Sequence, residues 1–430
     1  MLGVGFGIAV TVGNTVGAGI LRTPGEIAAQ LPSPWLFLAV WVAGGIYALL
    51  GSNAIAELGA MTPLSGGQYV FSRRAFGPFP GFIVGWSDWV ATCGSAGAVA
   101  LVASEYTGIL FPALAPYEKR LAASAILTFA VLNWAGVRWG DRTQQITSLL
   151  KAAAYLVIVA ACFAFAGRAV TPTDSTAAAA APLRLTGVLL AVQAVIYTYD
   201  GWTGPIYFSE EVRQPGRDIP RALIGGALCV TVLYLLVNIA ILVVLPYSAI
   251  AGESLALATA ARAIFGPRGD TVVRALIVVG MLSAINALLL MAPRVLYAVS
   301  RDGLGWRGAT SVNEGGTPTV ALLLSTVVAM LFLADTFAGA IAVLAFFFVA
   351  NYVFSFTALF VLRRREPAAP RPYRAWGHPW TTAILLVASL AFLVTAVRSD
   401  TRHSVYALLA LGVSYPVYLV LNRPRLQEQG

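Results

Sequence analysis

Charged residues are scarce in this sequence. Asp, Glu, Lys and Arg make up 11% of the 430 residues, whereas apolar residues make up 58%. A soluble domain carries about 25% charged residues, so this chain has too little charge to cover a water-facing surface. Intrinsic disorder is also excluded, because it requires low hydrophobicity and high net charge. The composition therefore predicts a membrane protein.

Cysteine and histidine are rarer still. The three cysteines, Cys93, Cys162 and Cys229, lie far apart in apolar surroundings, which excludes a disulfide-stapled secreted domain. The two histidines, His378 and His403, are both expected in loops, and no zinc-ligand, Walker or nucleophile-elbow pattern occurs. We therefore expect no metal site, no cofactor and no enzymatic activity.

Basic residues outnumber acidic ones and give a formal net charge of +9. A nucleic-acid-binding protein would gather them in a patch or stripe, but here they form short clusters between apolar blocks. We expect no nucleic-acid partner. The clusters instead suit the loops of a membrane protein, where Lys and Arg set the orientation.

Long apolar blocks are abundant. A helix needs about 20 mainly apolar residues to cross a bilayer core of about 30 Å. No soluble domain separates the blocks, and the N-terminus does not have the pattern of a signal peptide. The sequence predicts twelve spans, at residues 3–31, 34–60, 78–110, 121–137, 143–167, 185–209, 221–246, 270–299, 317–335, 338–362, 379–397 and 403–421.

The connections between the spans differ in charge. One side holds seventeen Lys and Arg and the other holds nine, while Arg22 and Lys151 lie inside spans. The positive-inside rule assigns the richer side to the cytoplasm. We therefore expect a multi-pass protein of the plasma (inner) membrane with both termini in the cytoplasm.

Two spans in matching positions should be broken. The first contains the run Gly13 to Gly19 followed by Pro24-Gly25, and the sixth contains an ionisable residue, two glycines and a proline between Tyr197 and Pro205. They lie five spans apart, and such a pair of interrupted segments points to an inverted-repeat transporter. The alternative for the first span is close helix packing, because Gly13 and Gly17 have a small-xxx-small spacing.

The broken spans also suggest a ligand. Unwound backbone inside a membrane is tolerated only where it faces a cavity or other protein. Free amides around Gly17 to Gly19, at the start of the half-helix that follows, would favour a carboxylate. Free carbonyls around Tyr197 to Tyr199 could accept hydrogen bonds from an ammonium group. Together the two breaks describe a zwitterion, which indicates an amino acid.

Five strings of residues, in order along the chain, carry a resemblance to a known family. The whole chain resembles the amino acid–polyamine–organocation (APC) superfamily of permeases, and within it the bacterial relatives of the L-type amino acid transporters. The strings are Gly17-Ala18-Gly19-Ile20, Pro63 to Tyr69, Tyr199-Asp200-Gly201-Trp202 with the loop from Ser209 to Ala222, Arg294 to Gly303, and Leu362 to Tyr373.

The resemblance implies an all-α polytopic membrane protein with the LeuT-like fold. In that fold, broken helices 1 and 6 begin two inverted repeats of five spans, here residues 1–167 and 185–362, and two peripheral spans follow at residues 379–421. Substrate would lie between spans 1, 3, 6, 8 and 10. The substrate-binding residues expected on this basis are Val16, Gly17, Ala18, Gly19, Ile20, Tyr197, Thr198, Tyr199, Asp200 and Gly201.

Tyr197 and Lys151 receive specific roles from the resemblance. Tyr197 would gate the pocket from outside; the alternative is a packing or interfacial aromatic. Lys151 would take the place of sodium by contacting carbonyls of broken span 1, with Asn14 as a polar partner; the alternative is a side chain that snorkels to the surface. Asn238 lacks the Tyr that often follows three positions later in relatives, so a polar link from span 7 to Lys151 is not assured.

Several other charged residues lie in or near spans. Asp200 could receive a substrate ammonium, pair with a neighbour or bond its own unwound segment. Asp88, Glu105 and Glu57 are further intramembrane carboxylates, and Glu57 is close enough to the cytoplasmic end to be solvated. Glu210, Glu211 and Arg213 form an inner gate in one interpretation, with Arg73 and Arg74 as cross-loop partners, and a solvated loop in the other.

The expected function is secondary active transport of amino acids by alternating access, without sodium, by exchange or by proton symport. Neutral amino acids are favoured, because Asp200 is not joined by a cluster of acidic residues. Alternatives are a cationic amino acid or polyamine antiporter and a membrane amino-acid sensor. The expected partners are the amino-acid substrate, the lipid bilayer and, for symport, a proton; the sequence does not define an oligomeric state.

Overall fold

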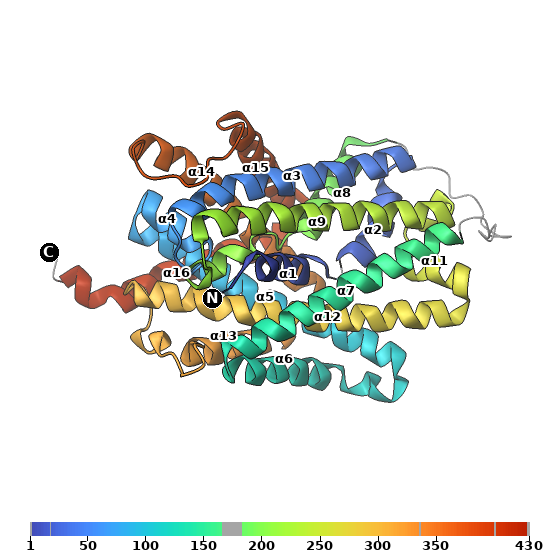
Figure 1. The fold of residues 1–430 in the computed structure, drawn as a ribbon, viewed down its shortest axis with the longest axis horizontal. Coiled ribbons are helices and arrows are strands. Elements are labelled where there is room, and N and C mark those ends of the chain that lie inside the picture. The colour runs from blue at the N-terminus through green and yellow to red at the C-terminus, as the bar shows by residue number, and fades with distance from the viewer. Residues whose placement is uncertain (1, 18, 166–182, 335–336, 400, 428–430) are drawn as a thin grey trace.

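The computed structural model describes residues 2–17, 19–165, 183–334, 337–399 and 401–427. Within these ranges the chain is helical and contains no β-strand, only two isolated β-bridges. The longer helices run along the long axis of the molecule, with α4 at one end and α11 at the other (Figure 1). We name these the α4 end and the α11 end of the bundle.

The α-helices are α1 (Val4–Thr15), α2 (Gly19–Gln30), α3 (Pro34–Met61), α4 (Gln68–Phe76), α5 (Pro78–Leu110), α6 (Glu118–Trp134), α7 (Val137–Ala164), α8 (Leu185–Tyr199), α9 (Pro215–Val244), α10 (Tyr247–Ile250), α11 (Ala256–Phe265), α12 (Pro267–Arg301), α13 (Thr319–Leu331), α14 (Phe337–Arg365), α15 (Trp380–Ser399) and α16 (Thr401–Gln427). Short 3₁₀ segments are η1 (Pro112–Tyr117), η3 (Gly204–Glu211), η4 (Arg307–Thr310) and η5 (Phe332–Ala334).

Eight of the helices in the described ranges are long and apolar enough to cross a membrane, and α1 with α2 forms a ninth candidate span that bends by 49° at its break. The three other predicted spans coincide with α6, α8 and α13, which have 17, 15 and 13 residues. The structure is therefore that of an all-helical, multi-pass membrane protein.

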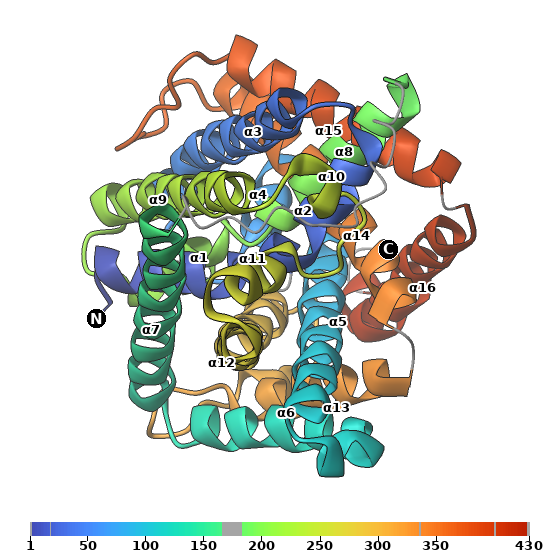
Figure 2. The ribbon, with the colours of Figure 1, turned by 90° about the vertical axis from the view of Figure 1, so that its right-hand side faces the viewer.

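The broken helices lie inside a frame of long helices. Helix α5 packs along α12, and α3 packs along α9. Viewed from the α11 end, α1 and α2 run between these two pairs, and α11 covers the end of α12 (Figure 2). This arrangement surrounds both helix breaks with protein, as unwound backbone in a membrane requires.

Two expectations about surface residues are wrong. His403 is not in a loop, because α16 begins at Thr401; His378 does lie in the connection before α15. Glu57 is not solvated, because its side chain is fully buried. The connection between α14 and α15 folds back over the end of α3, so that a position near the end of the span is still covered by protein.

The buried Glu57 carboxylate is fully bonded. Arg363 donates from Nε and Nη2 at 2.9 and 2.5 Å, and Arg371 donates from Nε at 3.1 Å. The backbone amide of Ala375 donates at 2.7 Å. A buried carboxylate is tolerated when it is paired and hydrogen-bonded in this way, so these contacts fasten the connection onto α3.

Candidate functional site

The first break separates α1 from α2. Helix α1 ends at Thr15 and α2 begins at Gly19, so the amides at the start of α2 have no preceding turn of helix. Gly13 is packed closely, because a Cβ there would lie 1.8 Å from the Gln144 side chain, whereas a Cβ at Gly17 would meet nothing closer than 3.7 Å. Helix packing therefore accounts for Gly13 but not for Gly17.

The second break separates α8 from η3. Helix α8 ends at Tyr199, and Gly201 has a φ of +109°, which an L side chain rarely adopts. A Cβ on Gly201 would also lie 2.9 Å from the side chains of Asn14 and Thr15. Glycine is thus needed at position 201 for two reasons: it can adopt the positive φ, and it lets Asn14 and Thr15 of the first break pack against the second.

Asn14 and Tyr234 tie the two breaks together. Asn14 Nδ2 donates to the Gly201 carbonyl at 3.3 Å, and the Tyr234 hydroxyl lies 2.7 Å from the Thr15 carbonyl and 3.2 Å from the Thr198 carbonyl. The expected pairing of Asn14 with Lys151 is therefore replaced by a bond to the other break. Span 7 thus contacts the two breaks through Tyr234, while Asn238 donates to the Tyr234 carbonyl and not to the region of Lys151.

Lys151 reaches the end of α1 from α7. Its ammonium donates to the Gly13 carbonyl at 3.0 Å and to the Val16 carbonyl at 2.6 Å. The residue is 2% exposed, so the side chain does not snorkel to the surface. A fixed cation thus satisfies carbonyls that the broken helix leaves without intrahelical partners.

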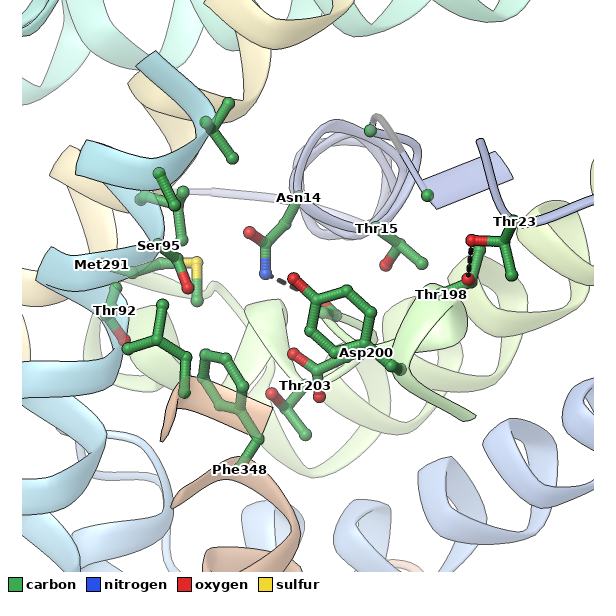
Figure 3. Close-up of a pocket in the computed structure, with 18 of the residues that line it drawn as sticks. Asn14, Thr15, Thr23, Thr92, Ser95, Thr198, Asp200, Thr203, Met291 and Phe348 are labelled. Atoms are coloured by element: carbon green, nitrogen blue, oxygen red, sulfur yellow. Dashed lines mark hydrogen bonds between the residues drawn. The ribbon is translucent and has the colours of Figure 1, made fainter. Parts of the chain in front are cut away.

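A cavity of about 440 Å³ lies where the two breaks meet. Thr92, Ser95 and Met291 form one side of it, opposite Asn14, Thr15 and Asp200 (Figure 3). The wall is drawn from α1, α2, α5, α8, the segment through η3, α12 and α14. Its residues are Asn14, Thr15, Gly17, Gly19, Arg22, Thr23, Glu26, Thr92, Ser95, Ala98, Val99, Ala194, Tyr197, Thr198, Asp200, Gly201, Thr203, Tyr207, Leu288, Met291, Leu344 and Phe348.

The predicted substrate-binding residues divide into two groups. Those in the cavity wall are Gly17, Gly19, Tyr197, Thr198, Asp200 and Gly201. Val16, Ile20 and Tyr199 are buried elsewhere, and Tyr199 donates its hydroxyl to the Trp41 carbonyl of α3. Ala18 lies outside the described residues.

The wall residues from α5, α12 and α14 were not predicted individually. Thr92 and Ser95 are one turn apart on α5, and this spacing of two hydroxyls in an apolar span is the signal that could have indicated them. Met291 and Phe348 carry no comparable signal, because large apolar residues are common throughout these helices.

Two buried carboxylates are bonded to tyrosines. Asp200 accepts a hydrogen bond from the Tyr352 hydroxyl of α14 and a backbone hydrogen bond from Gly201, so the structure displays pairing with a neighbour and bonding within its own unwound segment. Asp88 accepts from the Tyr207 hydroxyl at 2.7 Å. Because Tyr207 also lines the cavity, Asp88 lies directly behind the cavity wall.

Ion pairs close the bundle between the cavity and the α4 end. Glu211 pairs with Arg294 at 2.6 Å and Glu210 with Arg301 at 2.5 Å, both on α12. The expected pairing with Arg73 and Arg74 is wrong, because these arginines bind Asp302 and Glu366. The Arg213 side chain is exposed, and its backbone amide donates to the Leu2 carbonyl at 3.1 Å.

The start of α1 is joined to the end of η3 by backbone atoms. Leu2 and Val212 form a parallel β-bridge, in which the Leu2 amide donates to the Glu211 carbonyl at 2.7 Å. The halves of the two broken helices that point toward the α4 end are therefore connected to each other. Among the described residues, no group of three or more His, Cys, Asp or Glu side chains could hold a metal ion.

Known proteins with similar sequences are transporters. The chain is 28% identical to the serine/threonine exchanger SteT of Bacillus subtilis over 430 residues, which cover 98% of this chain and 97% of that protein. It is 28% identical to the mouse b(0,+)-type amino acid transporter 1, covering 92% and 82%, and 27% identical to the human cystine/glutamate transporter, covering 86% and 75%.

A family model also matches nearly the whole chain. The model describes amino acid permeases and covers residues 7–415, which include both helix breaks, Lys151 and every residue of the cavity wall. Its relatives are transporters and not enzymes. The chain therefore belongs to the amino acid permease family, within the APC superfamily.

Proposed function

We propose that this chain is a secondary active transporter that moves amino acids by alternating access and does not use sodium. The observation that carries the proposal is the cavity at the meeting point of two helix breaks, with the Lys151 ammonium bonded to carbonyls of α1. A pocket of about 300–1,000 Å³ suits a small-molecule ligand. A built-in cation at the first break supplies the charge that a bound sodium ion would otherwise bring.

Polar groups in the wall suit an amino-acid backbone. Gly17 and Gly19 present the start of α2, where free amides and the helix dipole favour a carboxylate. Within the described part of the chain, the buried Thr15 Oγ1 in this wall has no hydrogen-bond partner. The carbonyls of Tyr197 and Thr198 already have protein partners, so we assign the ammonium to Asp200 and to the neighbouring Thr15 hydroxyl.

The remaining wall favours a small neutral side chain. Thr92, Ser95 and Thr203 offer hydroxyls, while Met291 and Phe348 offer apolar surface. The relative named as a serine/threonine exchanger is consistent with such a substrate. Asp200 in the wall supports the alternative of a cationic amino acid or polyamine, although its carboxylate is bonded to Tyr352.

The proposed topology is twelve spans in two inverted repeats with two peripheral helices. The α4 end carries the more basic connections and faces the cytoplasm. The cavity reaches Arg22 and Glu26 on α2, on the side that faces the outside in this topology, and we assign the outer gate to Tyr197 in its wall. The ion pairs of Glu210 and Glu211 keep the cytoplasmic end closed.

The orientation is tested with two fusions at the C-terminus. A fluorescent protein that matures only in the cytoplasm should be bright, and alkaline phosphatase, which is active only outside, should be inactive. A dark fluorescent fusion together with active phosphatase would reverse the orientation.

Transport itself is tested with the purified protein in liposomes. We expect uptake of a labelled small neutral amino acid into vesicles preloaded with unlabelled amino acid, with the same rate when choline replaces sodium. Stimulation by an inward proton gradient in empty vesicles would identify symport, and dependence on the preloaded amino acid would identify exchange. If no amino acid or amine is taken up in either format, the proposal fails; ligand-induced thermal stabilisation without uptake would favour a sensor.

A further inference from the structure

An ion pair joins the second half of the first broken helix to α5 at the mouth of the cavity. Arg22 on α2 donates from Nη2 to Glu105 Oε2 at 2.9 Å and from Nε to the Tyr106 hydroxyl at 3.2 Å. Its guanidinium also lies 5.4 Å from the centre of the Tyr106 ring. Arg22 therefore spans the distance from the cavity wall to the last turns of α5.

The Arg22–Glu105 pair is more exposed to solvent than the buried ion pair of Glu57 and Arg371. The Arg22 and Glu105 side chains are 26% and 45% exposed, whereas Glu57 and Arg371 in the connection after α14 are 0% and 4% exposed. Partly exposed ion pairs contribute little net stability because water competes for both partners. The Arg22 pair can thus break and re-form at small cost, which a clamp around a buried carboxylate cannot.

The two helices also have different attachments. Helix α2 continues from the break at Gly17 and packs on α8, the helix that precedes the other break. Helix α5 packs on α12, α13 and α14, and its wall residues Thr92 and Ser95 lie deep in the cavity. A contact between α2 and α5 therefore bridges the opening through which substrate must pass.

We propose that Arg22 and Glu105, with Tyr106, form the outer latch of the transport cycle, which opens to admit substrate and closes over it. This inference builds on the proposed function and adds the groups that hold the outer side shut. The ion pairs of Glu210 and Glu211 lie at the opposite end of the cavity. Alternation then requires that the latch is closed when those inner pairs are broken.

The first test measures access to the cavity and does not depend on transport. Ser95→Cys supplies a thiol in the cavity wall, in a chain whose three native cysteines are replaced. We expect Glu105→Gln, which removes the charge of the partner, to raise the labelling rate of that thiol by an impermeant external reagent about tenfold. Asp270→Asn is the matched control, because Asp270 pairs with Arg274 within one helix, at 2.7 Å. An unchanged labelling rate in Glu105→Gln would overturn the latch.

The second test locks the two helices together. Arg22→Cys with Glu105→Cys, joined by a bifunctional thiol reagent, should lose at least about nine-tenths of its uptake and regain it on reduction. The same reagent on Asp270→Cys with Arg274→Cys should leave uptake unchanged, since that pair lies within α12. Full uptake with the α2–α5 cross-link in place would also overturn the latch, whereas the absence of uptake in the parent protein would instead refute the proposed function.

Discussion

Lys151→Ala is expected to lower the initial rate of amino acid uptake at least about 100-fold. The ammonium makes two charge-assisted hydrogen bonds to carbonyls at the end of α1. Each such bond contributes about 1.5–3 kcal/mol, and the lower sum of about 3 kcal/mol corresponds to about 100-fold. Without the cation, the Gly13 and Val16 carbonyls lose these bonds, and the start of the substrate site loses its position. Initial rates in proteoliposomes measure the effect.

Arg274→Ala is the matched control for this loss. It also removes one cation, but from a partly exposed ion pair within α12, so we expect uptake to stay within about twofold. Uptake near the wild-type rate in Lys151→Ala would contradict the proposed role. Any residual uptake by Lys151→Ala gives two further readouts. Stimulation of this uptake by added sodium would support the replacement of a sodium ion by the lysine. Exchange that no longer varies with pH would indicate that Lys151 carries a proton.

Glu57→Ala is expected to destabilise the folded protein by about 3–5 kcal/mol. This is the usual cost of removing one partner from a buried ion pair, because the other charge stays buried and unpaired. Here Arg371 is 4% exposed and would lose its carboxylate together with Arg363. We expect a large fall in the melting temperature in detergent, measured by size-exclusion chromatography of heated samples.

Glu366→Ala provides the comparison for Glu57. Glu366 pairs with Arg74 at 2.6 Å, but both side chains are about one-third exposed. A surface pair of this kind contributes about 0–1 kcal/mol, so the variant should melt close to the wild type. Equal melting temperatures for the two variants would show that the connection after α14 is not fastened through Glu57.

The helix breaks could be predicted because their causes are local. Glycine and aspartate have low helix propensity in any sequence. They occur at the breaks as Gly13, Gly17, Gly19 and the pair Asp200-Gly201, and Gly201 has a positive φ. The approach of Lys151 to α1 followed from the resemblance and not from spacing along the chain. The residues themselves therefore indicate the positions of the helix breaks but not the contacts that the breaks make.

Other contacts depend on how distant segments pack, and for these the sequence was insufficient. Arg73 and Arg74 could pair with any nearby carboxylate, and the choice of Asp302 and Glu366 follows from the positions of α12 and the connection after α14. Thr92 was hidden for a different reason. A threonine in a helix commonly bonds the carbonyl four residues earlier, as Thr92 does with Asp88 at 2.7 Å. Thr92 alone therefore does not indicate a cavity-facing position, and only its spacing from Ser95 does.

The bridge between Leu2 and Val212 has a consequence for how this protein can be mutated and labelled. Its hydrogen bonds use main-chain atoms alone, so any substitution other than proline leaves both donors and acceptors in place. An alanine scan would therefore not detect the link between the two half-helices that point toward the α4 end. Deleting Leu2, or placing a proline at position 213 where an amide donates, would expose it. A fusion partner attached close to Leu2 would therefore restrict the movement of both half-helices at once.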